Sequence, residues 1–184
     1  MPPKQRITRE MILERSFVMF SEEGMESVNA RSVAKALNCS TQPIFSYFSG
    51  MDDLKNALEQ KAKETFDGVL ASLADDGDPI VRICEAYIRF AAQEPRLFTH
   101  LFLRPVEVAI HPLRGQEIKN ELVAKECAFG GMDEAKAARV YTELSIYAHG
   151  FAALFASGHA RVDMDTVKQM LTDAYRAIVM RLNA

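Results

Sequence analysis

The 184-residue chain has no tryptophan, only three cysteines and no hydrophobic run of membrane-spanning length. A helix that crosses a bilayer needs about 20 consecutive apolar residues, and the N-terminus also lacks the hydrophobic region of a secretory signal. We therefore expect a cytoplasmic protein without a membrane partner. Cys39, Cys84 and Cys127 are odd in number and widely spaced, which indicates buried free thiols rather than a disulfide framework or a zinc site.

The sequence also lacks the short motifs that mark common enzyme sites. It holds no glycine-rich phosphate loop, no nucleophile elbow, no zinc-protease histidine pair and no dinucleotide-binding fingerprint. Its histidines are not helical neighbours, because His100 and His111, like His149 and His159, are too far apart in sequence. We therefore expect no enzymatic activity, no cofactor and no metal ion.

Strand patterns are missing as well. No stretch shows sustained alternation of β-branched and polar residues, whereas prolines and glycines separate segments of helical length. We predict an all-α fold in which Asn29 and Asp78 cap helices, while Gly24 and Asn38 follow helices in the left-handed region. Apart from one short helix around Pro43, the expected helices cover residues 8–23, 30–37, 51–73, 79–92, 95–103, 112–128, 133–157 and 165–182.

A proline lies inside the short segment Cys39-Ser-Thr-Gln-Pro-Ile-Phe-Ser-Tyr-Phe48. If Ser40 caps a helix here, Pro43 is its third residue; if Gln42 is the cap, Pro43 is its first. Either placement keeps the proline in the first turn, where its missing N–H has no intrahelical acceptor to lose. Together with helix 30–37 and a tight turn, the segment has the spacing of a helix-turn-helix unit, whose second helix enters the major groove of DNA.

The residues of this second helix divide into an apolar and a polar set. We predict that Ile44, Phe45 and Phe48 pack against the other helices. The amide of Gln42 can pair with adenine. For each polar residue, the alternative to a DNA contact is a position on a solvated helix surface. The predicted DNA contacts are Arg31, Ser40, Thr41, Gln42, Pro43, Ser46, Tyr47 and Lys55.

The net charge of −3 is distributed unevenly along the chain. Through Lys63 there are nine basic against eight acidic residues, so most of the acidic excess lies further on. Lys4, Arg6 and Arg9 lie in a first segment of nine residues that contains no acid. Such a basic arm can contact phosphates, and a solvated terminus is the alternative.

Many spaced positions in the first 55 residues agree together with one known pattern. They are Ile12, Leu13, Ser16, Phe17, Phe20, Gly24, Val33, Ala34, Leu37, Ser40, Ile44 to Phe48 and Leu54. In these residues the chain resembles the DNA-binding domain of the TetR (tetracycline-repressor) family of bacterial transcription regulators. The resemblance covers about residues 8 to 55.

This resemblance implies a domain plan and a set of partners. An N-terminal helix-turn-helix domain, residues 1–50, is joined through helix 51–73 to a helical effector-binding and dimerisation domain, residues 51–184. The family pattern implies a homodimer that binds a palindromic operator in double-stranded DNA, with a small-molecule effector in the C-terminal domain.

Two positions depart from the residues that the family commonly has. Phe45 stands in place of a tyrosine, and Met51 in place of a lysine. Both changes remove a group that can reach a phosphate, so the resemblance implies that the basic arm, Arg31 and Lys55 supply this contact. Tyr47 matches a position that commonly meets the DNA backbone.

Aromatic residues and histidines in the C-terminal part form a candidate effector pocket, for which a plain hydrophobic core is the alternative. The candidate lining residues are Phe90, Phe98, His100, Phe102, Tyr141, His149 and Phe151.

The last two expected helices, about 133–157 and 165–182, carry apolar stripes that either complete a monomer's core or pair with a second copy in a four-helix interface. The stripes consist of Val140, Leu144, Ala148, Phe151 and Phe155 in the first helix, and of Val167, Leu171, Ala174, Ile178 and Leu182 in the second.

Three functions are compatible with these patterns. The first is a repressor whose DNA binding is modulated by an effector. The second is a DNA-binding regulator without a small-molecule effector. The third is a small helical enzyme or carrier in which the helix-turn-helix spacing is incidental.

Overall fold

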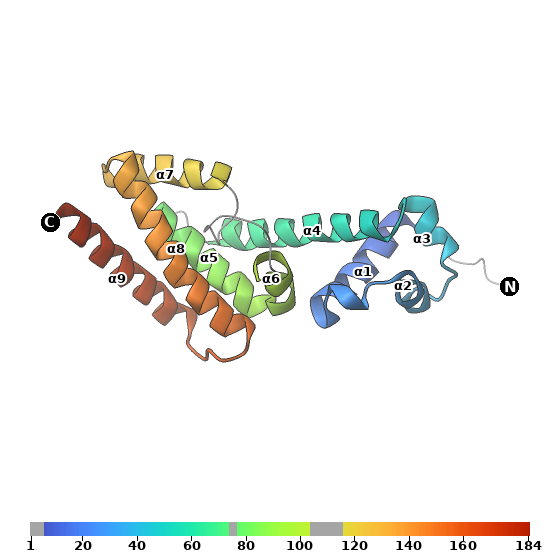
Figure 1. The fold of residues 1–184 in the computed structure, drawn as a ribbon. Coiled ribbons are helices and arrows are strands. Elements are labelled where there is room, and N and C mark those ends of the chain that lie inside the picture. The colour runs from blue at the N-terminus through green and yellow to red at the C-terminus, as the bar shows by residue number, and fades with distance from the viewer. Residues whose placement is uncertain (1–5, 74–76, 104–115) are drawn as a thin grey trace. The chain divides into compact units, whose positions relative to one another are not determined.

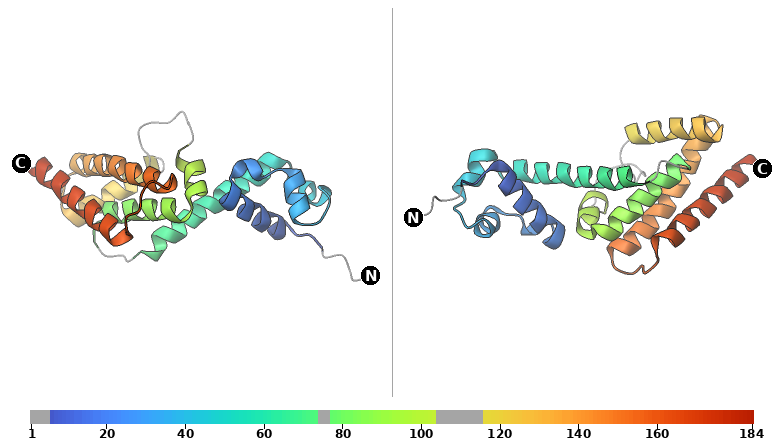
Figure 2. Two further views of the ribbon diagram at one scale, coloured as in Figure 1. Left: turned by 90° about the horizontal axis from the view of Figure 1, so that it is seen from below. Right: turned by 180° about the vertical axis from the view of Figure 1, so that it is seen from behind.

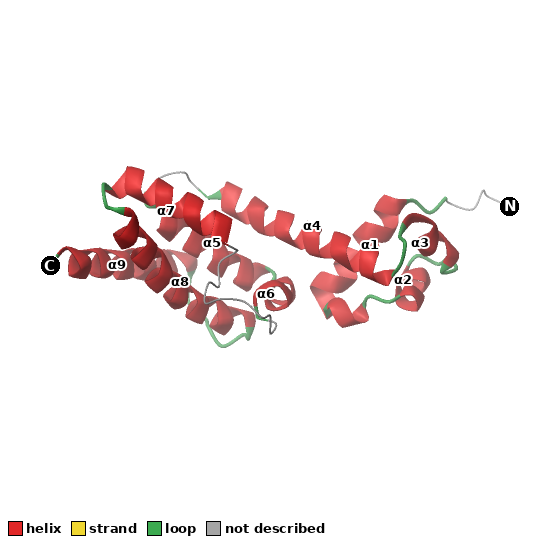
Figure 3. Ribbon diagram, turned by 45° about the horizontal axis from the view of Figure 1, so that its top comes forward, coloured by secondary structure: helices red, strands yellow, loops and turns green. Residues whose placement is uncertain are grey.

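The computed structural model describes residues 6–73, 77–103 and 116–184. These ranges contain helices and loops without any strand, which confirms the all-α expectation (Figure 1 and Figure 3). None of their helices combines the length and the apolar character that a bilayer crossing requires. The α-helices in these ranges are α1 (Arg9–Glu23), α2 (Ala30–Ala36), α3 (Gln42–Tyr47), α4 (Met51–Ser72), α5 (Pro79–Gln93), α6 (Pro95–Phe102), α7 (Gln116–Gly130), α8 (Glu134–Ala156) and α9 (Met164–Asn183), and a 3-10 helix η1 covers Met25–Ser27.

The chain divides into two compact units, Met1–Thr65 and Phe66–Ala184. Helix α4 contributes to both, since it begins at Met51 and ends at Ser72. The observed helix ends lie within two residues of the expected ones, apart from the expected residues 112–115, which lie outside the described residues.

Side-chain caps explain where several helices begin. The Thr8 hydroxyl accepts a hydrogen bond from the Met11 backbone N–H at 3.2 Å, and Asn29 forms a capping box with Ser32 at the start of α2. The Asp78 carboxylate accepts from the backbone N–H groups of α5. Each cap satisfies an N–H that has no partner inside its own helix, and the caps predicted at Asn29 and Asp78 are confirmed.

Two residues with positive φ end the first two helices. Gly24 has φ 97° and ψ 165°, and its backbone N–H donates to the Phe20 carbonyl at 3.0 Å. Because this combination of angles is open to glycine and strained for other residues, Gly24 allows the sharp exit from α1. Asn38 has φ 51°, so the predicted left-handed residue between α2 and α3 is confirmed.

Helix α3 begins one residue away from both expected positions. Thr41 is its N-cap and Gln42 its first residue, so Pro43 is the second residue rather than the third or the first. The proline still lies in the first turn, where a missing N–H costs no intrahelical hydrogen bond.

Each helix of the first unit contributes buried apolar side chains to the core of that unit. Ile12 and Phe20 of α1, Val33 of α2, Ile44 of α3 and Leu54 of α4 are fully buried. Burying a side chain of this size stabilises a fold by about 1.5–3 kcal/mol. These contacts hold the short helix α3 in place, since a six-residue helix is not stable alone.

Helix α5 is the centre of the second unit. It contacts α6, α7, α8 and α9, and it lies beside α8 and α9 (Figure 1 and Figure 2). Its buried residues include consecutive positions such as Ile83, Cys84 and Glu85, so the helix is covered on nearly all sides. Cys84 is the fully buried thiol, whereas Cys39 and Cys127 are half-buried, and all three are free.

Candidate nucleic-acid interface

The second helix of the helix-turn-helix unit, α3, has one face turned inward and one turned to solvent. Ile44 and Phe48 are buried, with 0% and 1% of their surfaces exposed, as the apolar pattern predicts. They are four residues apart and therefore share a face. These two side chains anchor α3 and leave its other positions to face outward.

Phe45 corrects the expectation that three apolar residues of α3 pack inside. Its side chain is 51% exposed. The physical reason is helical geometry, because a residue next to Ile44 is rotated about 100° away from the face that Ile44 and Phe48 bury. Phe45 thus adds an apolar ring to the outward face.

The polar candidates of this segment lie on the outward face or at its edge. Gln42, Ser46 and Tyr47 are exposed, as is Ser40, while Thr41 and Pro43 are half-buried. The Ser46 hydroxyl donates to the Gln42 backbone carbonyl at 3.0 Å.

A groove of about 760 Å³ runs between the N-terminal arm, the turn before α3 and α3 itself. It brings together five of the predicted DNA-contacting residues, and Thr41, Arg31 and Lys55 are not part of its lining. The lining residues are Arg6, Ile7, Met11, Leu37, Asn38, Cys39, Ser40, Gln42, Pro43, Ser46 and Tyr47.

Tyr47 joins the recognition helix to the arm. Its hydroxyl donates to the Ile7 backbone carbonyl at 3.3 Å. A hydrogen bond across 40 sequence positions fixes the direction of the arm just before α1, where Arg6 is exposed. The Tyr47 hydroxyl therefore has a partner inside the protein.

The first turn of α1 contributes a second basic group that the expected contact set omits. The Arg9 guanidinium carbon lies 4.9 Å from the centre of the Phe48 ring, a cation–π arrangement. This contact places Arg9 beside the end of α3. The sequence signal for Arg6 and Arg9 is the acid-free basic arm, but only the fold shows which of its cations lie next to the recognition helix.

The two outlying candidates occupy different helices. Arg31 is exposed in the first turn of α2, and Lys55 is half-buried in α4. Near Lys55, the Asp53 carboxylate accepts hydrogen bonds from the Ser49 backbone N–H at 2.9 Å and from the Ser49 hydroxyl at 3.2 Å. An acidic residue at this helix N-terminus stabilises α4.

Three of the candidate effector residues, Phe98, Phe102 and His149, contact a tyrosine that the sequence pattern does not single out. Tyr87 is fully buried, and its ring centre lies 4.9 Å from those of Phe98 and Phe102. Its hydroxyl and the Nδ1 atom of His149 are 3.0 Å apart. Burial lowers the pKa of His149 and raises the pKa of Tyr87, so both groups are neutral near pH 7.

The remaining candidates differ in position. Phe90 packs edge-on against Phe102 with ring centres 6.3 Å apart, and Tyr141 is fully buried. His100 is half-buried on α6, whereas Phe151 packs against Tyr147 at 5.3 Å. The sequence does hold a signal for Tyr87 as a lining residue. It lies three residues before the candidate Phe90 on α5, and residues with this spacing share one face of a helix.

Two family models match this chain. The model described as "Tetracyclin repressor-like, C-terminal domain" matches residues 80–178, which is more than half of the chain, and the model described as "Bacterial regulatory proteins, tetR family" matches residues 12–58. The chain belongs to the TetR family. It is therefore a DNA-binding transcriptional regulator with an N-terminal helix-turn-helix.

Relatives of this TetR-family chain agree with the assignment. The HTH-type transcriptional regulator YobS of Bacillus subtilis (strain 168) is 22% identical over 163 residues, which are 85% of this chain and 83% of YobS. A TetR-like transcriptional regulator from Rhodococcus sp. RHA1 has the same fold, with a TM-score of 0.64, 16% identity and coverage of 92% of this chain and 96% of that chain. The multidrug binding protein EbrR, in complex with imidazole, superposes with a TM-score of 0.55 at 18% identity, over 90% of this chain and 88% of EbrR.

In this TetR-family chain, five of the ten residues in the expected apolar stripes of α8 and α9 are buried, and the other five, Phe151, Phe155, Ala174, Ile178 and Leu182, are half-buried. Val140, Leu144 and Ala148 of α8 and Val167 and Leu171 of α9 are buried within the chain. A different set of apolar side chains is exposed on the same helices, namely Ile146, Tyr147, Leu154, Met170 and Met180. Glu143 of α8 pairs with Arg181 of α9, so the two helices are also held together at the surface.

Proposed function

We propose that the protein is a repressor that binds a palindromic operator as a homodimer and that a small-molecule effector in its C-terminal unit changes its affinity for DNA. The observation that carries the DNA-binding half is the outward face of α3. It presents Gln42, Phe45 and Ser46 beside a groove whose other wall is the arm bearing Arg6.

Base recognition falls to the outward residues of α3. The Gln42 amide can donate to N7 and accept from N6–H of adenine, and the exposed ring of Phe45 can contact a thymine methyl group. Ser40, Thr41, Pro43 and Ser46 border these two side chains. Replacing the family's tyrosine by Phe45 thus exchanges a hydroxyl for an apolar contact in the major groove.

Phosphate contacts fall to the basic groups around this face. Arg6 and Arg9 lie next to α3, while Arg31 is the second residue of α2 and Lys55 is the fifth residue of α4. Phosphate contacts place a protein on the duplex without reading its sequence. The Tyr47 hydroxyl acts indirectly in this proposal, because it holds the arm through Ile7.

The effector half of the proposal rests on the polar pair inside the aromatic cluster. The Tyr87 hydroxyl and His149 are neutral hydrogen-bonding groups surrounded by rings, which suits an apolar ligand with one polar group. EbrR, which shares the fold, binds a small molecule. The candidate lining remains Phe90, Phe98, His100, Phe102, Tyr141, His149 and Phe151, with Tyr87 added.

The same cluster also supports the second function, a regulator without a small-molecule effector. Five aromatic rings pack edge-on or tilted with centre distances between 4.9 and 6.4 Å, namely those of Phe66, Tyr87, Phe90, Phe98 and Phe102. This is the packing of an ordinary aromatic core. In that case the second unit serves dimerisation alone.

The homodimer is proposed to form through the exposed apolar side chains of α8 and α9. Ile146 and Leu154 are 55% and 50% exposed, and Met180 is 73% exposed. Binding of such a dimer to a palindromic operator requires its two recognition helices to reach half-sites about one DNA turn, ~34 Å, or a multiple of it apart.

The test begins with selection of bound sequences from a random duplex library by the purified protein. We expect enrichment of an inverted repeat, and sedimentation should show two protomers per operator. Gln60 of α4 offers a matched control for Gln42, because both are exposed glutamines in the same unit. Absence of DNA retention even at low salt would rule out the proposed function and favour an enzyme or carrier. Release of the selected duplex by a small apolar compound would separate a ligand-responsive repressor from a regulator without effector.

A further inference from the structure

A second cavity in the C-terminal unit is charged rather than aromatic. It measures about 530 Å³ and lies between α5 and α9, next to the end of α4 and to Phe129 of α7. It shares no lining residue with the candidate effector pocket around Tyr87. Its chemistry therefore calls for a different class of ligand.

Basic side chains dominate the described lining of this groove. Arg82 and Arg89 come from α5, and Lys168 and Arg176 come from α9. Asp78 and Glu85 are the acidic groups in the described lining. Within the described lining, four cations face two carboxylates, which is an excess of positive charge, and Arg176 is in addition paired with Asp173 at 3.8 Å.

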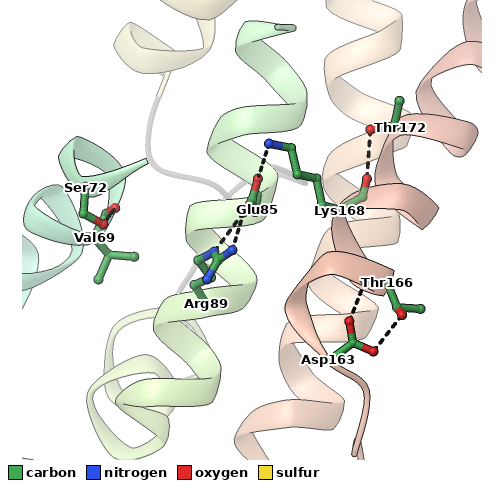
Figure 4. A network of polar contacts seen from close by, with 8 residues as sticks. All are labelled: Val69, Ser72, Glu85, Arg89, Asp163, Thr166, Lys168 and Thr172. Carbon is green, nitrogen blue, oxygen red and sulfur yellow. Dashed lines mark hydrogen bonds and ion pairs between the residues drawn. The ribbon is translucent and has the colours of Figure 1, made fainter. Parts of the chain in front are cut away.

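The Glu85 carboxylate neutralises only part of this positive charge. It is 4% exposed, and its Oε1 atom accepts hydrogen bonds from Arg89, with Nε at 2.8 Å and Nη2 at 2.7 Å. The Lys168 ammonium lies 3.9 Å from the other oxygen, Oε2 (Figure 4). Both Arg89 nitrogens approach the same oxygen, and one guanidinium already neutralises the charge of one carboxylate, so Lys168 brings a second positive charge to Glu85.

The Lys168 side chain is available to a ligand. It reaches from α9 across to α5 (Figure 4), it is 51% exposed, and at 3.9 Å from Glu85 it is beyond hydrogen-bond distance. The neighbouring hydroxyls of Ser72 and Thr172 each donate to a backbone carbonyl of their own helix. The cations are therefore the strong donors that an incoming group would meet.

The lining also contains apolar side chains. Val69 of α4, Leu73 just after α4, Val81 of α5 and Phe129 of α7 line the same groove, together with the polar side chains of Gln93 and Tyr175. A ligand that fills it would combine an oxyanion for the basic side with a hydrocarbon part for the apolar side.

We propose that this groove binds a small organic anion whose oxyanion group, a carboxylate or a phosphate, is held by Lys168 and Arg89 and bridges α9 to α5. As a binding site the groove is independent of the proposed function, whereas its use as an effector site rests on that function. The coupling would act through α9, because α9 also carries part of the proposed dimer surface.

Calorimetric titration of the full-length protein tests the site. The probes are decanoate and benzoate as carboxylates and phenyl phosphate and inorganic phosphate as phosphates, each at constant ionic strength in chloride. We expect saturable binding of at least one organic probe, and the two series distinguish the carboxylate from the phosphate source. If no probe bound the wild-type protein above the chloride background, the proposal would be wrong.

Lys168→Gln is the decisive variant, and Lys125→Gln is its control. Lys125 is also an exposed lysine paired with one glutamate, Glu121, but it lies outside the groove. We expect Lys168→Gln to weaken probe binding by about tenfold, with Lys125→Gln unchanged and both variants folded by circular dichroism. Equal affinities in wild type and Lys168→Gln would overturn the site.

Operator binding measured on the same preparations separates this inference from the proposed function. Operator binding without any anion binding would refute the groove alone. Anion binding by a protein that retains no DNA would refute the proposed function and leave the groove in place. Weakening of operator binding by the anion, lost in Lys168→Gln, would join the two.

Discussion

The two units use their side chains in opposite ways. In the first unit a six-residue helix, α3, is anchored by Ile44 and by its C-cap Phe48, and most of its other side chains are exposed, where a partner can reach them. In the second unit α5 is buried on nearly all sides, and its polar groups, Glu85 and the Tyr87 hydroxyl, find partners inside the fold. The proposed DNA recognition thus depends on an exposed surface, whereas the aromatic cluster around Tyr87 consists of interior contacts.

The largest effect we expect distinguishes two phenylalanines of the first unit, Phe48 and Phe45. Phe48→Ala removes a ring that is 1% exposed and should lower the free energy of unfolding by about 3–5 kcal/mol. Phe45→Ala removes a ring that is 51% exposed and should change stability by less than about 1 kcal/mol while weakening operator binding. Urea unfolding and operator titration measure both. Equal losses of stability would contradict the assignment of Phe45 to the outward face.

The next largest effect that we expect is a pH dependence of the free energy of unfolding, caused by Glu126 in the second unit. Its side chain is fully buried, and Oε1 accepts a hydrogen bond from the Tyr175 hydroxyl. Burial, with the nearby Asp78 carboxylate adding to it, raises the pKa of Glu126 to about 7. The folded state therefore holds a proton that the unfolded state releases above about pH 4.5, and this group's contribution to stability falls as the pH rises from about 4.5 to 7.

Glu126→Gln should remove this dependence, because an amide stays neutral and can still accept from Tyr175. The variant should gain on the order of 1–3 kcal/mol relative to wild type between pH 5 and pH 8, measured by urea unfolding at both values. Glu121→Gln is the control, since Glu121 is an exposed glutamate of the same helix. A wild-type and a Glu126→Gln curve that ran parallel over this range would refute the raised pKa.

The third comparison concerns base readout and sets Gln42 against Gln60, two glutamines of the first unit. Gln42→Ala should weaken operator binding by about 1–3 kcal/mol and relax the preference at one or two base positions. Gln60→Ala should leave both unchanged. The measurement is a titration against operators substituted at each position. An unaltered base preference in Gln42→Ala would show that another side chain reads those bases.

Lys55→Ala should have a smaller and less selective effect. Because a phosphate contact carries no sequence information, binding to all duplexes should weaken alike, and the slope of log affinity against log salt should fall by about 1. The salt titration of wild type and variant checks this. A loss confined to the operator would assign Lys55 to readout instead.

The smallest effect concerns the arm. Tyr47→Phe removes the hydroxyl that donates to the Ile7 carbonyl and should cost less than about 1 kcal/mol of operator affinity. Once the arm is released, Arg6→Gln should no longer weaken binding in the Tyr47→Phe background. A double-mutant cycle measures this coupling, and additive effects would show that Tyr47 and the arm act separately.

Local patterns in the sequence predicted much of the helical framework. Asn29 and Asp78 cap helices because a short polar side chain next to a helical segment can satisfy its free N–H groups with no distant partner. The spacing of Ile44 and Phe48 likewise predicts their shared buried face. Phe45 shows the limit, since its hydrophobicity suggests burial while its angular position on α3 prevents it.

The sequence by itself determined the all-α class, the helix ends and the helix-turn-helix spacing, because these depend on interactions among residues at most a few positions apart. Only the tertiary structure decided that Tyr47 meets Ile7, that Tyr87 meets His149 and that Lys168 faces Glu85. Each of these pairs is separated by tens of residues, and a polar group chooses such a partner only after packing has brought the helices together.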